Sequence, residues 1–253
     1  MAQVPAARQT VAILRFLARQ AAPVPAATIA RELGLPRSTT YHLLATLQDA
    51  GFVVHLPQER RYGLGVGAYE LGTGYTRQAP LQRLARVQLA ALVDRTGHSA
   101  RLGVLHGRDV LFVLEERAPG RPPLVTDAGV RLPAQLTASG RAMLAALPAQ
   151  QVRALYPDPS AFVVRHQRGP RSPSALRQLL ADVRRLGHAV EEAEVTPGFA
   201  SVAAAVIDHT GHPVASIALT YPQEEIDERR RAELAERVID TAAALSKRIS
   251  GGL

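Results

Sequence analysis

The chain has 253 residues, of which 47% are hydrophobic and 21% charged, so it can build one or two globular domains with hydrophobic cores. It contains no cysteine, which excludes disulfides, thiolate nucleophiles and zinc sites built on sulfur. The net charge of +8 favours an anionic partner such as DNA, but charge alone does not identify that partner.

The amino-terminal residues predict two helices separated by a break. Apolar side chains recur near helical spacing from Val11 to Ala18, which predicts a first helix of about three turns. The segment Ala21-Ala22-Pro23-Val24-Pro25 interrupts this pattern, and a second helix is expected from Ala26 to Gly34. Because glycine accepts a left-handed conformation and proline suits the first turn of a helix, Gly34-Leu35-Pro36 predicts a tight turn.

A third helix and a short hairpin complete the amino-terminal pattern. The helix is expected from Arg37 to Asp49, after which the apolar period changes from helical to extended. Residues 52–55 and 60–64 then predict two strands around a turn at Pro57-Gln58-Glu59. Three helices followed by a hairpin is the order of a winged helix-turn-helix, so residues 1–65 are predicted to bind DNA.

The third helix has an apolar and a polar face. Thr40, Leu43, Leu44 and Leu47 follow helical spacing and predict the buried stripe. The opposite face would enter the major groove near the helix amino terminus, while arginines beside it and in the wing would contact phosphate or a minor groove. The alternative is an ordinary solvated helix face. The candidate DNA-binding residues are Arg37, Ser38, Thr39, Tyr41, His42, Arg60 and Arg61.

The rest of the chain mixes helical and extended patterns. Residues 66–79 predict a linker helix, and residues 80–253 predict a larger domain that begins with another helix. Strands and helices in this order are typical of an α+β fold with an antiparallel sheet. Strands are expected at residues 100–105, 110–115, 200–207 and 214–221, helices at 138–146, 174–186 and 225–249, and a surface loop at 165–173.

Nearly the whole length of the sequence resembles the IclR family of transcriptional regulators. In the amino-terminal part the matching stretches are Ile29-Ala30-Arg31-Glu32-Leu33-Gly34-Leu35-Pro36-Arg37-Ser38-Thr39, Leu43-Leu44-Ala45-Thr46-Leu47, Tyr62-Gly63-Leu64-Gly65 and Glu70-Leu71-Gly72. Thr137-Ala138-Ser139-Gly140-Arg141-Ala142 is similar to the pocket loop of the family. Residues 185–190 and 197–204 continue the match in the family's order.

The resemblance implies a GAF-like effector domain at residues 80–253 that binds a small metabolite, commonly an organic or aromatic acid. It also implies a homodimer or homotetramer whose affinity for a palindromic double-stranded DNA operator changes with that ligand. By position, the effector pocket would be lined by Ser139, Gly140, Glu191, Ser201, Ala218 and Thr220.

The implied pocket departs from the family at two single positions and in the pocket loop. Ser201 stands where the family often has cysteine, Ala218 stands where serine is common, and Ser139-Gly140-Arg141 replaces a more usual Leu-Gly-Lys. These changes alter the hydrogen-bond donors that a ligand would meet, so the identity of the effector does not transfer from the family.

The pocket loop has two physical interpretations. If a helix begins near Arg141, Gly140 offers free backbone N–H groups at a positive helix end, which is a seat for a carboxylate. If Ser139 caps that helix, its hydroxyl has a purely structural role. The residues alone leave both interpretations open.

An enzyme and an effector-independent or architectural DNA-binding protein are the alternative functions. The sequence has no Gly-x-Ser-x-Gly elbow, and Ser139 lacks a lysine or histidine at a recognisable spacing, so no catalytic residue is expected. His209 and His212 bracket Gly211 in a predicted hairpin turn, where polar residues are common, so neither a metal nor a cofactor is expected. The size of the carboxy-terminal domain argues against a purely architectural protein.

No membrane or export segment is expected from the sequence. The apolar runs are far shorter than the ~18 residues that span a membrane. Met1–Thr10 lacks the basic start and apolar core of a signal peptide. We therefore expect a cytoplasmic protein with no membrane partner.

Overall fold

The computed structural model describes residues 4–78, 80–121 and 128–250, with the side chains of residues 73–80 outside the description. The chain forms two compact units, residues 1–79 and residues 80–253. The predicted linker helix, residues 66–79, ends at this division, and Ala79 itself lies outside the described residues.

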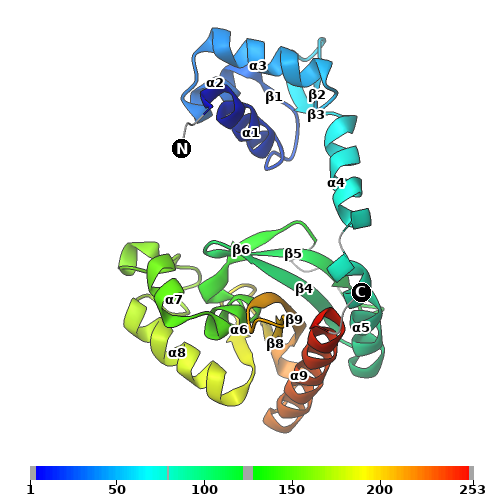
Figure 1. Ribbon diagram of the computed structural model, residues 1–253, viewed down its shortest axis with the longest axis vertical. Helices are drawn as coiled ribbons and strands as arrows, with labels where there is room; N and C mark the ends of the chain where they lie inside the picture. Colours follow the sequence, from blue (N-terminus) through cyan, green and yellow to red (C-terminus); the bar gives the residue numbers. More distant parts are fainter. Residues whose placement is uncertain (1–3, 79, 122–127, 251–253) are drawn as a thin grey trace. The chain divides into compact units, whose positions relative to one another are not determined.

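The first unit is a helical domain with a small antiparallel sheet (Figure 1). Ile13, Ile29 and Leu44 are completely buried at its centre, one from each of the first three helices. Gly34 ends the second helix with a positive φ of 63°, as the predicted turn requires. The elements are α1 (Pro5–Leu17), β1 (Val24–Pro25), α2 (Ala26–Leu33), α3 (Arg37–Asp49), β2 (Val53–Leu56), β3 (Arg61–Leu64) and α4 (Val66–Gln78).

One segment of the first unit differs from the sequence prediction. Val24–Pro25, expected as part of a break, forms the edge strand β1 and pairs with Tyr62 and Arg61 of β3. Proline is tolerated there because an edge strand does not need every N–H for pairing. The Arg61 side chain also donates to the Pro23 carbonyl at 3.1 Å, which ties the hairpin to this edge.

The second unit is built on a six-stranded antiparallel sheet in the order β6-β5-β4-β9-β8-β7. The α+β prediction is confirmed. Its strands are β4 (Ser99–His106), β5 (Asp109–Glu116), β6 (Arg131–Pro133), β7 (Ala189–Glu192), β8 (Phe199–Ile207) and β9 (Pro213–Pro222). Its α-helices are α5 (Pro80–Thr96), α6 (Ala138–Ala146), α7 (Ala149–Leu155), α8 (Pro173–Leu186) and α9 (Glu228–Ser250).

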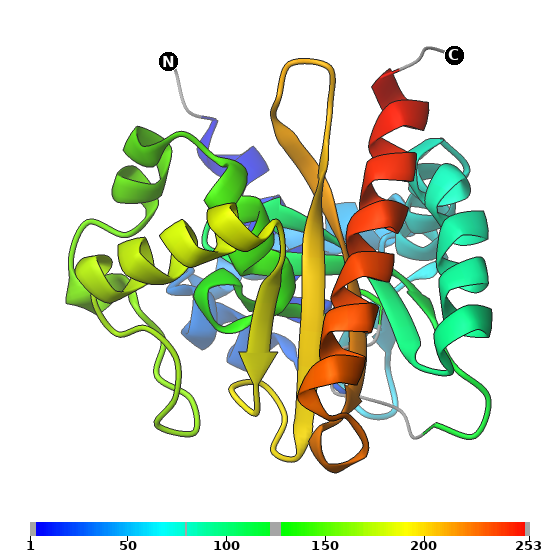
Figure 2. The ribbon, with the colours of Figure 1, turned by 90° about the horizontal axis from the view of Figure 1, so that it is seen from below.

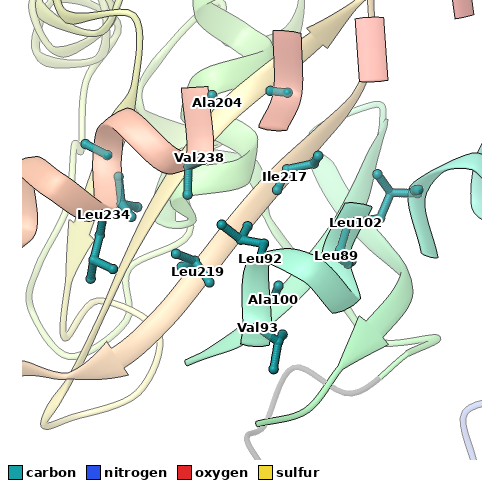
Figure 3. Packing of buried hydrophobic residues seen from close by; sticks show 14 of the residues in the cluster. Leu89, Leu92, Val93, Ala100, Leu102, Ala204, Ile217, Leu219, Leu234 and Val238 are labelled. Atoms are coloured by element: carbon teal, nitrogen blue, oxygen red, sulfur yellow. The ribbon is translucent and has the colours of Figure 1, made fainter. Parts of the chain in front are cut away.

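Helices cover both faces of this sheet, so its central strands are buried on both sides (Figure 2). On β9, Ile217 and Leu219 point into a core formed with α5 and α9 (Figure 3). Ala218, between them, points to the opposite face, into a second core that contains residues of α6 and α8. Successive side chains of a strand point to opposite faces, which explains this division. A polar residue at such a position is therefore enclosed.

Two strands and one α-helix of the second unit were not predicted. The strands β6 and β7 and the helix α7 are only 3, 4 and 7 residues long, too short for periodicity to detect. Glu191 and Glu192 both lie on β7, and Glu192 is its last residue. None of the described helices is both long and apolar enough to cross a membrane.

Candidate functional site

The exposed face of α3 is the first candidate site. Arg37, Ser38, Tyr41 and His42 are exposed on it, and Tyr41 exposes 53% of its surface. Thr39 is half-buried beside them. The opposite face carries the buried Thr40, Leu44 and Leu47, and the Thr40 hydroxyl donates to the Pro36 carbonyl at 3.0 Å. The helix therefore presents short polar and aromatic side chains near its amino terminus, with no acidic residue in the first turn.

The β2–β3 hairpin lies next to this helix. Its two arginines are in different environments. Arg60 stands in the turn with a positive φ of 54°. Arg61 is bound to the Pro23 carbonyl, so its guanidinium is partly engaged inside the unit. Behind them, the rings of His55 and Tyr62 stack with centroids 4.5 Å apart. Burial, and to a smaller extent Tyr41, raises the pKa of Tyr62. The strand β2 contacts α3 directly.

The second candidate site is a row of polar side chains across the sheet of the second unit. Glu191 on β7 pairs in register with Ser201 on β8, and Ser201 pairs in register with Thr220 on β9. The Ser201 hydroxyl lies 2.9 Å from both Glu191 Oε1 and Thr220 Oγ1. From β4, Arg101 Nη1 donates to Thr220 Oγ1 at 2.8 Å. Four adjacent strands thus carry one hydrogen-bonded chain with a carboxyl at one end and a guanidinium at the other.

Arg101 belongs to a buried charge cluster. Its side chain is 3% exposed, and Nη2 lies 3.5 Å from Glu115 Oε1 on β5. Arg117 approaches the other oxygen of Glu115 at 3.7 Å. The guanidinium carbon of Arg101 lies 6.0 Å from the centre of the Phe112 ring, within range of a cation–π contact.

Glu191 is the most perturbed acid of this row. It is 4% exposed, and its second oxygen accepts the Glu194 N–H at 3.2 Å. Burial, as the main cause, raises the pKa of Glu191 to about 8, and the charge of Glu194 adds to that rise while the hydrogen bond from Ser201 opposes it. The neighbouring Arg141 is held by Glu194 at 2.8 Å and does not pair with Glu191. At neutral pH the carboxyl therefore favours its protonated form.

The loop before α6 is organised differently from both sequence interpretations. The helix begins at Ala138, and its capping residue is Thr137, whose side chain accepts the Gly140 N–H at 3.0 Å. Gly140 thus has no free N–H to offer, and Ser139 is not the cap. Instead Ser139 Oγ is buried with no hydrogen-bond partner among the described residues. The helix begins at Ala138, in agreement with the predicted range 138–146, and not near Arg141 as the carboxylate-seat interpretation assumed.

Gly140 has a steric role. A side-chain carbon at this position would lie 2.2 Å from the Ala134 carbonyl oxygen, because α6 packs directly onto the short 3₁₀ helix Ala134–Leu136. Only glycine fits such an approach.

A small cavity of about 20 Å³ lies between the polar row and the start of α6. Five of the six residues predicted for the pocket line it, namely Ser139, Glu191, Ser201, Ala218 and Thr220, and Gly140 does not. Further residues line the cavity that were not predicted, among them Arg101, Phe112, Thr137, Val195 and Phe199. Arg101 and Phe112 lie on strands that were predicted, but no local signal shows which strand faces meet α6.

Comparison with protein families decides what these two units are. Residues 6–57 match the "IclR helix-turn-helix domain", and residues 73–247 match "Bacterial transcriptional regulator IclR C-terminal". The chain belongs to the IclR family of bacterial transcriptional regulators. It therefore has a DNA-binding helix-turn-helix unit and a carboxy-terminal effector unit, as the resemblance predicted.

Individual members of the IclR family match over almost the full chain. The "Glycerol operon regulatory protein" of Streptomyces coelicolor is 32% identical over 96% of this chain and 96% of its own length. The "Transcriptional repressor IclR" of Escherichia coli is 26% identical over 98% of this chain and 91% of its own length.

Solved structures share the fold. An IclR regulator from Alicyclobacillus acidocaldarius, 24% identical, aligns over 97% of this chain and 98% of its own with a TM-score of 0.85. An IclR homologue from Microbacterium hydrocarbonoxydans complexed with 4-hydroxybenzoate, 20% identical, aligns over 98% and 100% with a TM-score of 0.81. At these identities the likeness establishes the fold.

Proposed function

We propose that this regulator reads its operator with the exposed face of α3 and holds the DNA backbone with α3 and the wing. The observation that carries the proposal is the two-faced α3, with a buried apolar stripe on one side and an exposed polar surface free of acidic residues in its first turn on the other. Tyr41 and His42 would read bases, while Arg37, Ser38, Thr39, Arg60 and Arg61 would contact backbone or minor groove.

Selection of bound genomic fragments, followed by titration at several salt concentrations, tests this proposal. Tyr41→Ala and His42→Ala should relax base preference, whereas Arg60→Ala should weaken binding to all DNA and flatten the salt slope. Gln48→Ala, exposed near the other end of α3, is the matched control and should change neither. Intact sequence preference in both helix variants would contradict the assignment of the reading face.

The cavity of the second unit is the proposed effector site. It brings together a guanidinium, a carboxyl and several hydroxyls beside a helix start, all enclosed. An acidic ligand in a homologue, the 4-hydroxybenzoate complex, supports a small organic acid as the effector. The effector would change operator affinity by favouring one arrangement of the DNA-binding units, and a coupling of ~1–3 kcal/mol would give a 5- to 150-fold response.

Thermal stabilisation of the full chain by a metabolite panel tests the effector site, because a ligand that binds only the folded state raises its stability by mass action. Ligands that stabilise the chain should also shift its operator affinity. Tight, specific operator binding that no panel member changes would favour the alternative of an effector-independent DNA-binding protein.

The active form is proposed to be a homodimer, or a homotetramer built from it, on a palindromic operator. Support comes from apolar side chains left exposed in the first unit, Val4 and Val11 beside or on α1 and Val66, Tyr69 and Leu71 on α4, exposed by 48 to 73%. Light scattering of the full chain tests this, and Tyr69→Glu should lower the molar mass if α4 lies in the interface.

We also propose that the cavity binds without catalysis. Ser139 Oγ, the one candidate nucleophile raised by the sequence, has neither histidine nor lysine hydrogen-bonded to it among the described residues. A ligand recovered chemically unchanged after prolonged incubation with the protein is the expected result.

A further inference from the structure

A groove of about 80 Å³ lies between α7 and α8 in the second unit (Figure 1). Among the described residues it has no lining residue in common with the effector cavity. Leu176 and Leu180 of α8 are buried and form its floor, while Val152 of α7 and Pro173 of α8 are half-buried at its walls. An apolar side chain placed in this α7–α8 groove would therefore be surrounded by apolar neighbours.

Three exposed arginines line the same groove, Arg153 from α7 and Arg177 and Arg184 from α8. No acidic residue of the described chain lines it, and none of these three arginines forms an ion pair within the described ranges. Arg184 Nε donates to the Ala145 carbonyl at 2.7 Å, which holds that guanidinium in place. The groove thus combines an apolar floor with a cationic rim.

The positive charge extends over the whole segment that builds the groove. Residues 149–186, from the start of α7 to the end of α8, contain seven arginines, no lysine and two acids, which is a net charge of +5 out of the chain's +8. Both acids are engaged locally, because Asp182 pairs with Arg185 at 3.3 Å and Asp158 accepts the Ser160 N–H at 2.8 Å. Complementary charge favours an acidic partner for this surface.

The dimensions of the groove favour a chain segment over a small ligand. Its volume of about 80 Å³ is roughly half that of a ~150 Å³ cavity that holds benzene, so it has room for about one apolar side chain. The lining residues of α8 run from Pro173 to Arg184, a helical rise of ~17 Å. One apolar group with carboxylates spread over that length is what an amphipathic helix provides, because its side chains three or four residues apart share a face.

The acidic helix of this chain does not meet both requirements. Glu228, Glu236 and Asp240 are exposed on α9, but the apolar face of that helix, with Leu234 and Val238, is buried in the core of its own unit. A second copy could therefore offer α9 carboxylates to the rim, but no large apolar side chain of that face to the floor. The occupant that fits both is a helix of another protein.

We propose that the α7–α8 groove docks an acidic amphipathic helix of a partner protein, with one apolar side chain on Leu176 and Leu180 and carboxylates on the three arginines. This interaction is additional to operator and effector binding. It would give the regulator a protein contact on its second unit.

Fluorescence anisotropy of labelled peptides with the full-length protein tests the proposal. The probe is a helical peptide of glutamate and alanine with one central leucine on the glutamate-bearing face. Two matched peptides replace the leucine with serine or every glutamate with glutamine. The probe should bind at least ~10-fold more tightly than either, the loss expected when a central contact of an interface is removed. Equal affinity for all three peptides would overturn the proposal.

Charge reversal at the rim assigns the site. The double variant Arg153→Glu, Arg177→Glu should bind the probe at least ~10-fold more weakly than the wild type. Arg185→Glu is the matched charge control, since Arg185 is exposed on the same helix and does not line the groove. An equal loss in the control would show a general attraction between charges and no docking in the groove.

Two further measurements separate docking from a folding defect. The double variant should bind a lysine version of the probe more tightly than the wild type does, a gain that misfolding cannot produce. Ala149→Trp keeps every charge and fills the groove from the exposed first residue of α7, so it should weaken the probe. Unchanged probe affinity in Ala149→Trp, or no gain for the lysine peptide in a folded double variant, would refute the proposal.

Other occupants give different outcomes, and each would overturn the proposal. A small amphipathic acid is indicated if octanoate binds the wild type and not the double variant while the probe binds neither. A second copy is indicated if the double variant has a lower molar mass in light scattering and the probe does not bind. DNA is indicated if the double variant flattens the operator salt slope as Arg60→Ala should. With a docked protein helix, operator affinity, effector affinity and molar mass stay unchanged.

Discussion

Replacing Glu191 by glutamine should change how the stability of the second unit depends on pH. The pKa of Glu191 is raised to about 8, mainly by burial, whereas an unfolded glutamic acid titrates near ~4.3. Between these values the folded protein holds a proton that the unfolded chain releases. The stabilisation from this proton is fully present below the unfolded pKa and is lost as pH rises through the folded pKa.

The size of the effect follows from the same two values. Each pKa unit is worth ~1.4 kcal/mol, so the loss between pH 5 and pH 9 reaches at most about 4 kcal/mol. Glutamine cannot ionise, and it can still accept the Glu194 N–H while donating to Ser201. The variant should therefore resemble the wild type near pH 5 and be more stable than it near pH 9.

Differential scanning calorimetry of both proteins from pH 5 to pH 9 measures this difference. Subtracting the two profiles cancels the titration of other groups, such as Glu225 and Glu233, whose pKa values are lowered by hydrogen bonds from Arg121 and Arg230. Parallel stability curves for wild type and variant would show that Glu191 is ionised and compensated in the folded protein, and would refute the reasoning.

Three further substitutions test the packing around the two sites. Gly140→Ala places a carbon against the Ala134 carbonyl, so calorimetry should show the second unit destabilised by ~1–3 kcal/mol; an unchanged transition would contradict the close contact. Thr137→Ala removes the cap of α6 and should cost about 1 kcal/mol in the same assay. Leu44→Ala leaves a cavity in the core of the first unit, so it should cost ~2–5 kcal/mol there and weaken DNA binding without altering ligand affinity.

The first unit could be predicted from sequence because its signals are local. The third helix runs from Arg37 to Asp49 as expected, since Gly34 and Pro36 bound it on one side and the change to an extended period bounds it on the other. The buried stripe followed from spacing alone. What local patterns missed is β1, because pairing of Val24 with Tyr62 depends on a contact between distant segments.

The cavity could be predicted only in part because it depends on sheet pairing. On β4, Ala100 and Leu102 belong to the core under α5 and α9, and Arg101 points to the other face. An arginine between apolar residues normally indicates a solvated strand face. Only the covering of that face by α6 turns Arg101 into an enclosed side chain that lines the cavity. No periodicity in β4 carries that information.

The family resemblance marked Gly140 as a pocket residue, but it did not give the physical reason for a glycine at this position. A glycine next to a pocket suggests close approach of a ligand, but here the close approach is between α6 and the 3₁₀ helix at Ala134. This contact fixes the first turn of α6, and with it the Thr137 cap and the Ser139 hydroxyl that line the cavity. Gly140 therefore acts on the site through packing, so its replacement should lower ligand affinity and stability together.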